Sequence, residues 1–237
     1  MTVRRCLGVL AKWPLVGQVK TRLTPPLDPA AAARLYTAGV ADLLERLSAV
    51  RAEHALLLDR AVASPATLGW PPWAVVPQVE GDLGARLAAA RETLAGAGPG
   101  DRRGGEAPSA AHVVLVGADH FTLPARHLER AFSLLEGADV VLGPTFDGGY
   151  YAIGLAAAQP ALFTSMPWSH PELLARTLDR ATALGLRVAA LPPWYDVDDG
   201  GDLDFLRQHL RLEQLAGGTG SPRTHRVLVE LGGPEAP

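Results

Sequence analysis

The stretch Val113-Val114-Leu115-Val116-Gly117-Ala118-Asp119 decides the fold. Its first four residues are a run of strand length, and a short run that is apolar throughout is typical of a strand covered on both faces of its sheet. Such strands belong to parallel sheets flanked by helices. Because α/β proteins bind ligands beyond the carboxyl ends of their parallel strands, the stretch predicts that Asp119 lies at the functional edge of the sheet.

The rest of the chain alternates short apolar runs with helical patterns. Further strands are predicted at 6–11, 54–58, 74–79, 140–142, 150–155 and 186–191, and helices at 29–50, from 82 onward, and at 124–135, 171–184 and 202–212. This alternation predicts crossover connections and a mostly parallel sheet between helices, which is an α/β fold. The segment 96–110, rich in Gly, Pro and Arg, predicts a surface loop.

One domain is expected to span residues 1–212, followed by a C-terminal linker and extension over 213–237. The stretch 216–222 has the composition of a linker. Residues 226–231, beyond it, are predicted either to add an edge strand or to hang free. We expect the protein to be a monomer or a homodimer.

Composition excludes several classes of partner. The formal net charge is −3 over 237 residues, so no basic excess exists to neutralise a nucleic-acid backbone. No apolar run approaches the ~18 residues that a membrane span needs. The single cysteine, Cys6, excludes a disulfide within the chain and fits a reducing compartment. We therefore expect a cytoplasmic protein with neither nucleic-acid nor membrane partners.

Three cations follow the first predicted strand. Ala11 ends that strand, and Lys12, Lys20 and Arg22 lie in the loop after it. A lysine ammonium is a mobile point charge and an arginine guanidinium a planar fork, and both bind phosphate oxygens. Because the loop is expected at the functional edge, a phosphate site is favoured over the alternative of a solvated basic loop.

The same loop superficially suggests a P-loop, through Gly17 followed by Lys20-Thr21. A P-loop needs glycine directly before the lysine, so that backbone N–H groups can surround the phosphates. Val19 occupies that position, and a P-loop is therefore excluded.

A second candidate turn follows the third predicted strand. Its two glycines, Gly81 and Gly84, would allow the backbone to approach a flat ligand closely. Gln78 and Asp82 lie in the same turn and are predicted with them to bind the nucleotide. The alternative is ordinary turn chemistry, with Asp82 capping the helix that follows.

Carboxylates mark two further strand ends. Asp119 is well placed for Mg²⁺, or Mn²⁺ in its place, since Mg²⁺ prefers one or two carboxylates together with phosphate oxygens and water. In an extended stretch Asp196 and Asp198 point the same way and are predicted to complete this metal site. The alternative is a solvated acidic turn that caps a helix. His120 follows Asp119 directly, and a structural role is favoured for it.

Several motifs, taken in order, resemble a known family. They are Ala11-Lys12-Trp13-Pro14, Lys20-Thr21-Arg22-Leu23, Glu80-Gly81-Asp82-Leu83-Gly84-Ala85-Arg86, Gly117-Ala118-Asp119, Leu142-Gly143-Pro144-Thr145-Phe146-Asp147-Gly148-Gly149-Tyr150-Tyr151, Pro167-Trp168-Ser169 and Asp196-Val197-Asp198. Together they resemble a bacterial family assigned as glycosyltransferases, often called radical-SAM/selenodomain-associated transferases and sometimes linked to arsenosugar synthesis. The match covers about residues 5–210. The chain is also similar to 2-phospholactate guanylyltransferase in its Lys-x-Arg-Leu loop and its Asp-x-Asp element.

This resemblance implies a three-layer α/β/α, Rossmann-like GT-A fold, that of nucleotide-diphospho-sugar transferases, with a mostly parallel mixed sheet. It implies a Mg²⁺-dependent transferase that moves a glycosyl group from an NDP-sugar to a small-molecule acceptor. Nucleotidyl transfer from an NTP to a phosphorylated acceptor is the alternative, and a non-catalytic nucleotide-binding module is a third.

The resemblance also implies site roles. Asp119, Lys20 and Arg22 match catalytic positions, and the nucleotide site comprises Ala11, Lys12, Lys20, Arg22, Gln78, Gly81, Asp82 and Gly84. The acceptor site comprises Asp147, Gly148, Gly149, Tyr150, Trp168 and Ser169. The chain departs from the family pattern at His120-Phe121, where Ser-Pro is common, and at Asp199-Gly200-Gly201, where Thr-Pro-Glu is frequent.

Overall fold

The computed structural model describes residues 3–62, 64–96, 111–218 and 220–232. The strands are β1 (Arg4–Ala11), β2 (Glu53–Leu58), β3 (Ala74–Pro77), β4 (Ala111–Gly117), β5 (Val140–Pro144), β6 (Tyr150–Leu155) and β7 (Val188–Ala190). The helices are α1 (Pro29–Leu47), α2 (Leu83–Gly96), α3 (Ala125–Leu134), α4 (Pro160–Phe163), α5 (Leu173–Ala183), α6 (Gly200–Leu215) and α7 (Pro222–Glu230), with short 3₁₀ helices η1 (Thr21–Leu23) and η2 (Pro65–Leu68).

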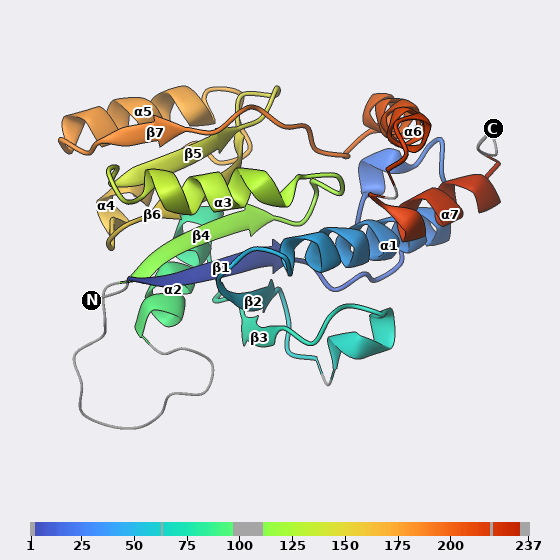
Figure 1. Ribbon diagram of the computed structural model, residues 1–237, viewed down its shortest axis with the longest axis horizontal. Coiled ribbons are helices and arrows are strands. Elements are labelled where there is room, and N and C mark those ends of the chain that lie inside the picture. The colour runs from blue at the N-terminus through green and yellow to red at the C-terminus, as the bar shows by residue number, and fades with distance from the viewer. Residues whose placement is uncertain (1–2, 63, 97–110, 219, 233–237) are drawn as a thin grey trace.

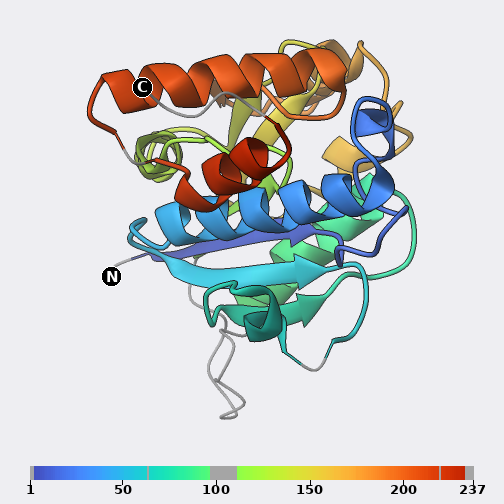
Figure 2. The ribbon, with the colours of Figure 1, turned by 90° about the vertical axis from the view of Figure 1, so that its right-hand side faces the viewer.

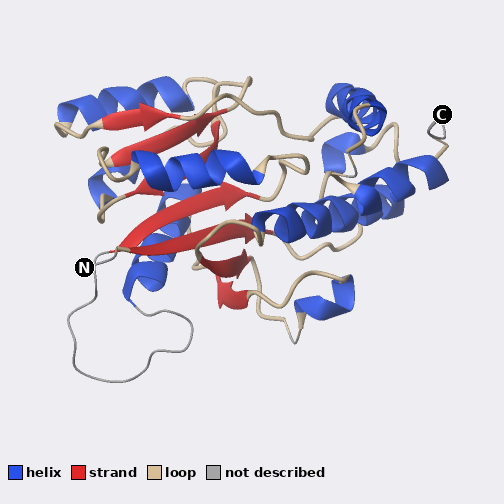
Figure 3. Ribbon diagram, in the orientation of Figure 1, coloured by secondary structure: helices blue, strands red, loops and turns tan. Residues whose placement is uncertain are grey.

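The strands form one sheet in the order β3-β2-β1-β4-β6-β5-β7 (Figures 1 and 3). β6 runs antiparallel to both of its neighbours, β4 and β5, whereas all other pairs are parallel. The mostly parallel mixed sheet predicted from the sequence is therefore confirmed. Because β6 alone is reversed, the other strands all end at the same edge, and the loops that follow them lie there together.

Helices cover both faces of this sheet. Alternate residues of β1 face opposite ways, so Leu7 and Val9 pack with α1, α3, α6 and α7, whereas Cys6 packs with α2, α4 and α5. Figure 2 shows α6, α7 and α1 side by side on the first face. The three-layer α/β/α arrangement is thus confirmed. Within the described ranges, no helix is long and apolar enough to cross a membrane.

Helix α1 illustrates how local sequence fixes an element. The Asp28 carboxylate caps the helix by accepting a hydrogen bond from Ala31 N at 2.8 Å, and Pro29 occupies the first helical position. Leu35, Leu43, Leu44 and Leu47 form its apolar stripe, and all four are fully buried. The helix ends at Leu47, three residues before the predicted limit.

The C-terminal extension corrects one expectation. Residues 226–231, for which an edge strand was one alternative, lie in and just after helix α7, and the edges of the sheet are β3 and β7. Pro222 starts the helix, and Thr224 and Leu228, one turn apart, are buried against its neighbours. A proline at the helix start and a face that is buried every fourth residue thus outweigh the β-branched residues Val227 and Val229. Apart from Gly96, the predicted loop 96–110 lies outside the described residues.

Gly39 of α1 generates a prediction about stability. A Cβ atom built on Gly39 would lie 2.4 Å from Cγ of the fully buried Phe121. Alanine gains about 1 kcal/mol over glycine within a helix, but overpacking a core costs roughly 1–3 kcal/mol. We expect Gly39→Ala to lower the free energy of unfolding by about 1–2 kcal/mol in urea denaturation. Gly96→Ala, whose Cβ would have no atom of the described residues within 4 Å, is the control and should cost nothing.

Candidate functional site

Two loops meet at the centre of the carboxyl edge. β1 pairs with β2 on one side and with β4 on the other, so the strand order reverses between β1 and β4. Crevices outside such a reversal are where open α/β sheets bind ligands. Lys20 lies in the loop after β1 and Asp119 in the loop after β4, so the topology brings two of the predicted site residues together.

Lys20 joins three segments of the chain. Its side chain is only 3% exposed; the ammonium forms an ion pair with Asp119 and lies 3.6 Å from Oδ1 of Asp198. The same nitrogen lies 5.9 Å from the centre of the Phe121 ring. A buried ammonium is costly unless it is paired. Lys20 therefore holds the loops after β1, β4 and β7 against one another.

Arg22 lies at the rim of this cluster. Its Nη1 donates to Oδ2 of Asp198 at 2.8 Å, while the side chain remains 78% exposed. An exposed ion pair of this kind contributes little to stability. Breaking the contact between this guanidinium and Asp198 would therefore cost little free energy.

Asp119 is held in its charged form. Burial favours the neutral carboxyl, but the Lys20 ammonium outweighs burial and keeps the pKa of Asp119 below its usual value. The side chain is nevertheless 49% exposed, so one part of the carboxylate faces solvent. The Asp119 carbonyl accepts a hydrogen bond from Val197 N at 3.0 Å, which ties the acidic segment to this loop.

The pKa of Asp196 is shifted in the opposite direction to that of Asp119. Burial raises the pKa of Asp196 to about 6, and repulsion from Asp147 and Asp202 adds to the effect. Asp147 was predicted for the acceptor site and Asp196 for the metal site, so the structure places these two regions close together. Asp202 accepts hydrogen bonds from the backbone N atoms of Asp198 and Asp199, at 2.8 and 2.9 Å, which fixes the acidic turn at the start of α6.

The donor set fits one kind of metal binding. Among the described residues there is no group of three or more His, Cys, Asp or Glu side chains that could hold an ion. Asp119 and Asp198 instead flank one ammonium group. Mg²⁺ usually binds through one or two carboxylates and completes its shell with phosphate oxygens and water. These residues therefore suit an ion that is bound together with a phosphate, not a cage made by the protein alone.

The predicted nucleotide residues lie beside the first loop. Gln78 Nε2 donates to two backbone carbonyls, that of Ala11 at 3.2 Å and that of Leu57 at 2.7 Å. Both amide hydrogens are thereby used, which leaves Oε1 as the polar group that a ligand can meet. The backbone of Lys12 is fixed by Tyr36, whose hydroxyl accepts from Lys12 N at 3.0 Å.

The structure gives Asp82 and Gly84 packing roles. Asp82 Oδ1 accepts from Ala85 N at 2.8 Å and caps α2, as the alternative reading of this turn expected. A Cβ atom on Gly84 would lie 2.6 Å from Cζ2 of Trp168. The small size of Gly84 is thus required by an indole ring, and the predicted nucleotide and acceptor regions touch here. Gly81 has a φ of 119°, which favours glycine.

The predicted acceptor loop connects β5 and β6 as a hairpin. Asp147 Oδ1 accepts from Gly149 N at 3.1 Å, and Gly148 has a φ of 90° and packs against the Pro171 carbonyl. Phe146, which the sequence did not single out, is 75% exposed in this loop. Beyond it, Tyr150 is half-buried, whereas Ser169 is exposed with a φ of 61°.

Tyr195 is the residue most clearly missed. Its carbonyl bonds His120 Nδ1 at 3.1 Å, and its hydroxyl accepts from Thr122 Oγ1 at 2.8 Å. The hydroxyl also bonds His209 Nδ1 of α6 at 2.7 Å. His120 is therefore buried and held by the Tyr195 backbone, and the loop after β4 is anchored to the acidic segment. The aromatic pair Trp194-Tyr195, directly before the acidic run, is the signal that could have identified it.

Comparison with solved structures places this architecture. The chain resembles a Desulfovibrio desulfuricans G20 protein provisionally assigned as a nucleotide-diphospho-sugar transferase, with 27% identity, a TM-score of 0.80 and 95% of each chain covered. It also resembles CMP:2-keto-3-deoxy-manno-octonic acid synthetase complexed with CTP, with 12% identity, a TM-score of 0.55 and coverage of 89% of this chain and 99% of that one. A third similar structure is that of 4-diphosphocytidyl-2C-methyl-D-erythritol synthase, with 11% identity, a TM-score of 0.53 and coverage of 89% of this chain and 99% of that one. The nucleotide-diphospho-sugar transferase fold predicted from the sequence is confirmed.

The family follows from the sequence itself. The model of the family described as "Uncharacterized protein conserved in bacteria (DUF2064)" matches residues 41–170. This is more than half of the 237 residues, and the chain belongs to that family. No curated protein sequence matches the chain.

The raised pKa of Asp196 predicts a dependence of stability on pH. Below about pH 3 the folded and unfolded states both hold this proton, and it contributes no pH dependence there. As the pH rises toward 6, the unfolded chain loses the proton more readily than the folded protein, so the wild type loses stability there. Asp196→Asn removes this loss. Without divalent metal, the variant should match the wild type near pH 3 and exceed it by about 2–3 kcal/mol at pH 7, measured by urea denaturation. A constant difference across this range would contradict the assignment.

Proposed function

We propose that this protein is a Mg²⁺-dependent transferase that moves a glycosyl group from an NDP-sugar to a small-molecule acceptor. One observation carries the proposal: Lys20, Arg22, Asp119 and Asp198 form a single cluster of two cations and two carboxylates at the strand-order reversal. The provisional assignment of the Desulfovibrio desulfuricans structure points in the same direction.

The cluster suits a diphosphate leaving group. In glycosyl transfer, negative charge grows on the departing nucleoside diphosphate, and fixed positive charge near its oxygens lowers the barrier. Lys20 and Arg22 would donate to those oxygens. Asp119 and Asp198 would hold Mg²⁺, which as a Lewis acid neutralises diphosphate charge when bound. Asp196 is a further candidate ligand for the ion.

The surrounding loops divide naturally between the two substrates. Ala11, Lys12 and Gln78 lie on the β1 and β3 side, where Gln78 Oε1 would accept a hydrogen bond from the nucleoside. Asp147 lies on the β5 side, next to the exposed ring of Phe146. A small acceptor with hydroxyl groups would meet a carboxylate and an aromatic face there.

Nucleotidyl transfer is the second candidate. In this reaction a phosphorylated acceptor attacks the α-phosphate of an NTP and pyrophosphate leaves. The presence of two cations, Lys20 and Arg22, in one short segment favours it, because a triphosphate brings about one phosphate more charge than an NDP-sugar. A relation to 2-phospholactate guanylyltransferase, proposed from the Lys-x-Arg-Leu loop, is consistent with this chemistry.

Asp119→Asn tests the metal assignment. The variant should fold, with a stability loss of about 1–3 kcal/mol because the buried Lys20 ammonium keeps only Asp198 as a charged partner. It should lose Mg²⁺-dependent binding of nucleotides, measured by thermal shift across NTPs and NDP-sugars and then by calorimetry. The control is Asp204→Asn, an exposed carboxylate paired with Arg207. Unchanged affinity of the folded Asp119→Asn variant in Mg²⁺ would remove Asp119 from the site.

Lys20→Ala separates the two reactions. Loss of one charge-assisted contact costs roughly 1.5–3 kcal/mol, which is about ten- to a hundredfold in affinity. For glycosyl transfer, the variant should lose that factor in NDP-sugar affinity, and NTPs should act only as competitors. For nucleotidyl transfer, it should lose the factor for NTPs and leave NDP-sugar binding little changed. Release of pyrophosphate by the wild type from an NTP and a phosphorylated acceptor would decide for the second reaction.

A further inference from the structure

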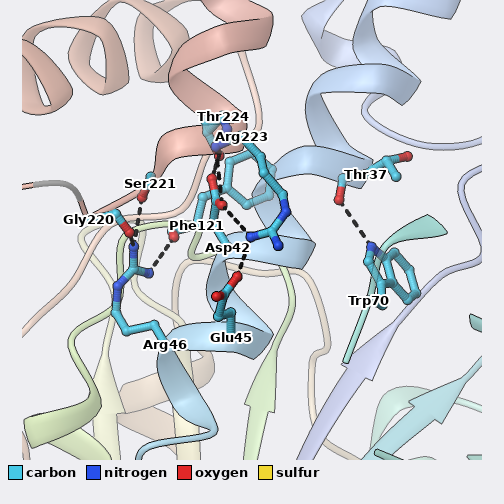
Figure 4. A network of polar contacts seen from close by, with 10 residues as sticks. All are labelled: Thr37, Asp42, Glu45, Arg46, Trp70, Phe121, Gly220, Ser221, Arg223 and Thr224. Carbon is cyan, nitrogen blue, oxygen red and sulfur yellow. Dashed lines mark hydrogen bonds and ion pairs between the residues drawn. The ribbon is translucent and has the colours of Figure 1, made fainter. Parts of the chain in front are cut away.

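Arg46 connects the loop that carries Asp119 to the C-terminal helix. It lies in the last turn of α1, and its Nη1 donates to the Phe121 carbonyl at 2.8 Å. Its Nη2 donates to Ser221 Oγ at 2.7 Å and also to the Gly220 carbonyl (Figure 4). One guanidinium therefore spans two segments that lie about a hundred residues apart in the chain, and the rigid fork fixes both at once.

The Phe121 end of this contact lies beneath the site. The ring is fully buried and packs against Gly39, where a Cβ would be 2.4 Å from it, and edge-on against Tyr36 with centroids 6.4 Å apart. The Lys20 ammonium lies 5.9 Å from the centre of the same ring. Phe121 also follows Asp119 by only two residues. Movement of its carbonyl would therefore shift both partners of the Lys20–Asp119 ion pair.

The other end depends on the docking of α7. Asp42 of α1 has a side chain with no solvent exposure, and Thr224 satisfies it through its backbone N and its Oγ1, both at 2.7 Å. Arg223 pairs with the same carboxylate at 3.2 Å and with Glu45 (Figure 4). A buried carboxylate without these donors would be strongly unfavourable. The start of α7 is thus fixed on α1 at the place where Arg46 reaches it.

Because Arg46 is half-buried, it depends on its acceptors both at Phe121 and at the start of α7. Desolvation lowers the pKa of its guanidinium, which Glu213 and Asp42 oppose by raising it. A half-buried cation of this kind needs its hydrogen-bond acceptors. If α7 moves away, Arg46 loses the acceptors at Gly220 and Ser221 and is free to leave Phe121 as well.

We infer that Arg46 is a positioning residue for the Lys20–Asp119 pair, and that docking of α7 keeps that pair in place. The inference rests on the proposed function for the importance of the pair, but its test needs no nucleotide. The family match ends at residue 170. The inference therefore makes α7, which lies outside that match, part of the working site.

Chemical acetylation of Lys20 reports directly on the accessibility of the Lys20–Asp119 pair. The only lysines of the chain are Lys12 and Lys20. Lys12 is exposed, whereas the Lys20 side chain is 3% exposed. Limited acetylation with acetic anhydride, followed by mass spectrometry of the two peptides, therefore compares the buried ammonium with an internal reference in the same molecule.

Arg46→Ala should raise the ratio of Lys20 to Lys12 acetylation by about tenfold, the factor for one lost charge-assisted contact. It should also speed hydrogen exchange of the amides in 117–123 more than elsewhere. Arg46→Lys, which keeps one donor for the Phe121 carbonyl, should restore part of the wild-type ratio. Thr224→Val, which removes a hydrogen bond between α7 and Asp42 but leaves Arg46 in place, should raise the ratio too. This variant provides the test if Arg46→Ala does not fold.

Arg4→Ala is the matched control. Arg4 also bridges two backbone carbonyls, those of Leu94 and Ala95, but at the start of β1, the opposite edge of the sheet. It should leave the acetylation ratio unchanged even where it lowers stability. An equal ratio in the folded Arg46→Ala, Thr224→Val and Arg4→Ala variants would overturn the inference. Absence of nucleotide binding by the wild type would instead count against the proposed function alone.

Discussion

The buried ammonium of Lys20 is the constraint on which the carboxyl edge of this protein depends. An unpaired ammonium in this place would cost several kcal/mol. Asp119 and Asp198 supply the compensating charge. Because these residues come from three loops far apart in the sequence, the loops after β1, β4 and β7 must fold against one another for any of them to be stable.

The direction of the strands brings these three loops together. Parallel strands bring their carboxyl ends to one edge, and the single reversed strand, β6, does not disturb that edge because β5 and β7 return to the common direction. The reversal of strand order between β1 and β4 separates the loops there and leaves room for side chains to meet. A P-loop would fill this position with backbone N–H groups, whereas here it is occupied by paired side-chain charges.

Much of this could be predicted from the sequence because the signals are local. Apolar runs such as 113–116 predict buried strands, and the Asp28-Pro29 cap predicts the start of α1. The fold, and the edge of the sheet at which the candidate site lies, follow from such signals. The contact of Lys20 with Asp198 could not be predicted, since no local pattern records which loops meet. Gly84 suggested an approach to a flat ligand, whereas the atom it accommodates belongs to Trp168, more than 80 residues away. Arg46 gave no signal, because its importance lies entirely in its partners.

Under the proposed function, charge balance within the cluster couples the binding of the metal to the binding of the phosphate. Lys20 and Arg22 cancel Asp119 and Asp198, so the cluster is neutral in the free protein. Mg²⁺ alone must draw the carboxylates away from Lys20 and leave a buried ammonium poorly paired, and a phosphate alone must draw the cations away from the carboxylates. When both arrive, the metal takes the carboxylates and the phosphate takes the cations, and no charge is left uncompensated. Metal and phosphate should therefore strengthen each other's binding reciprocally, which follows from linkage between the two sites. The coupling originates in the pairing that holds the loops together before any ligand is bound.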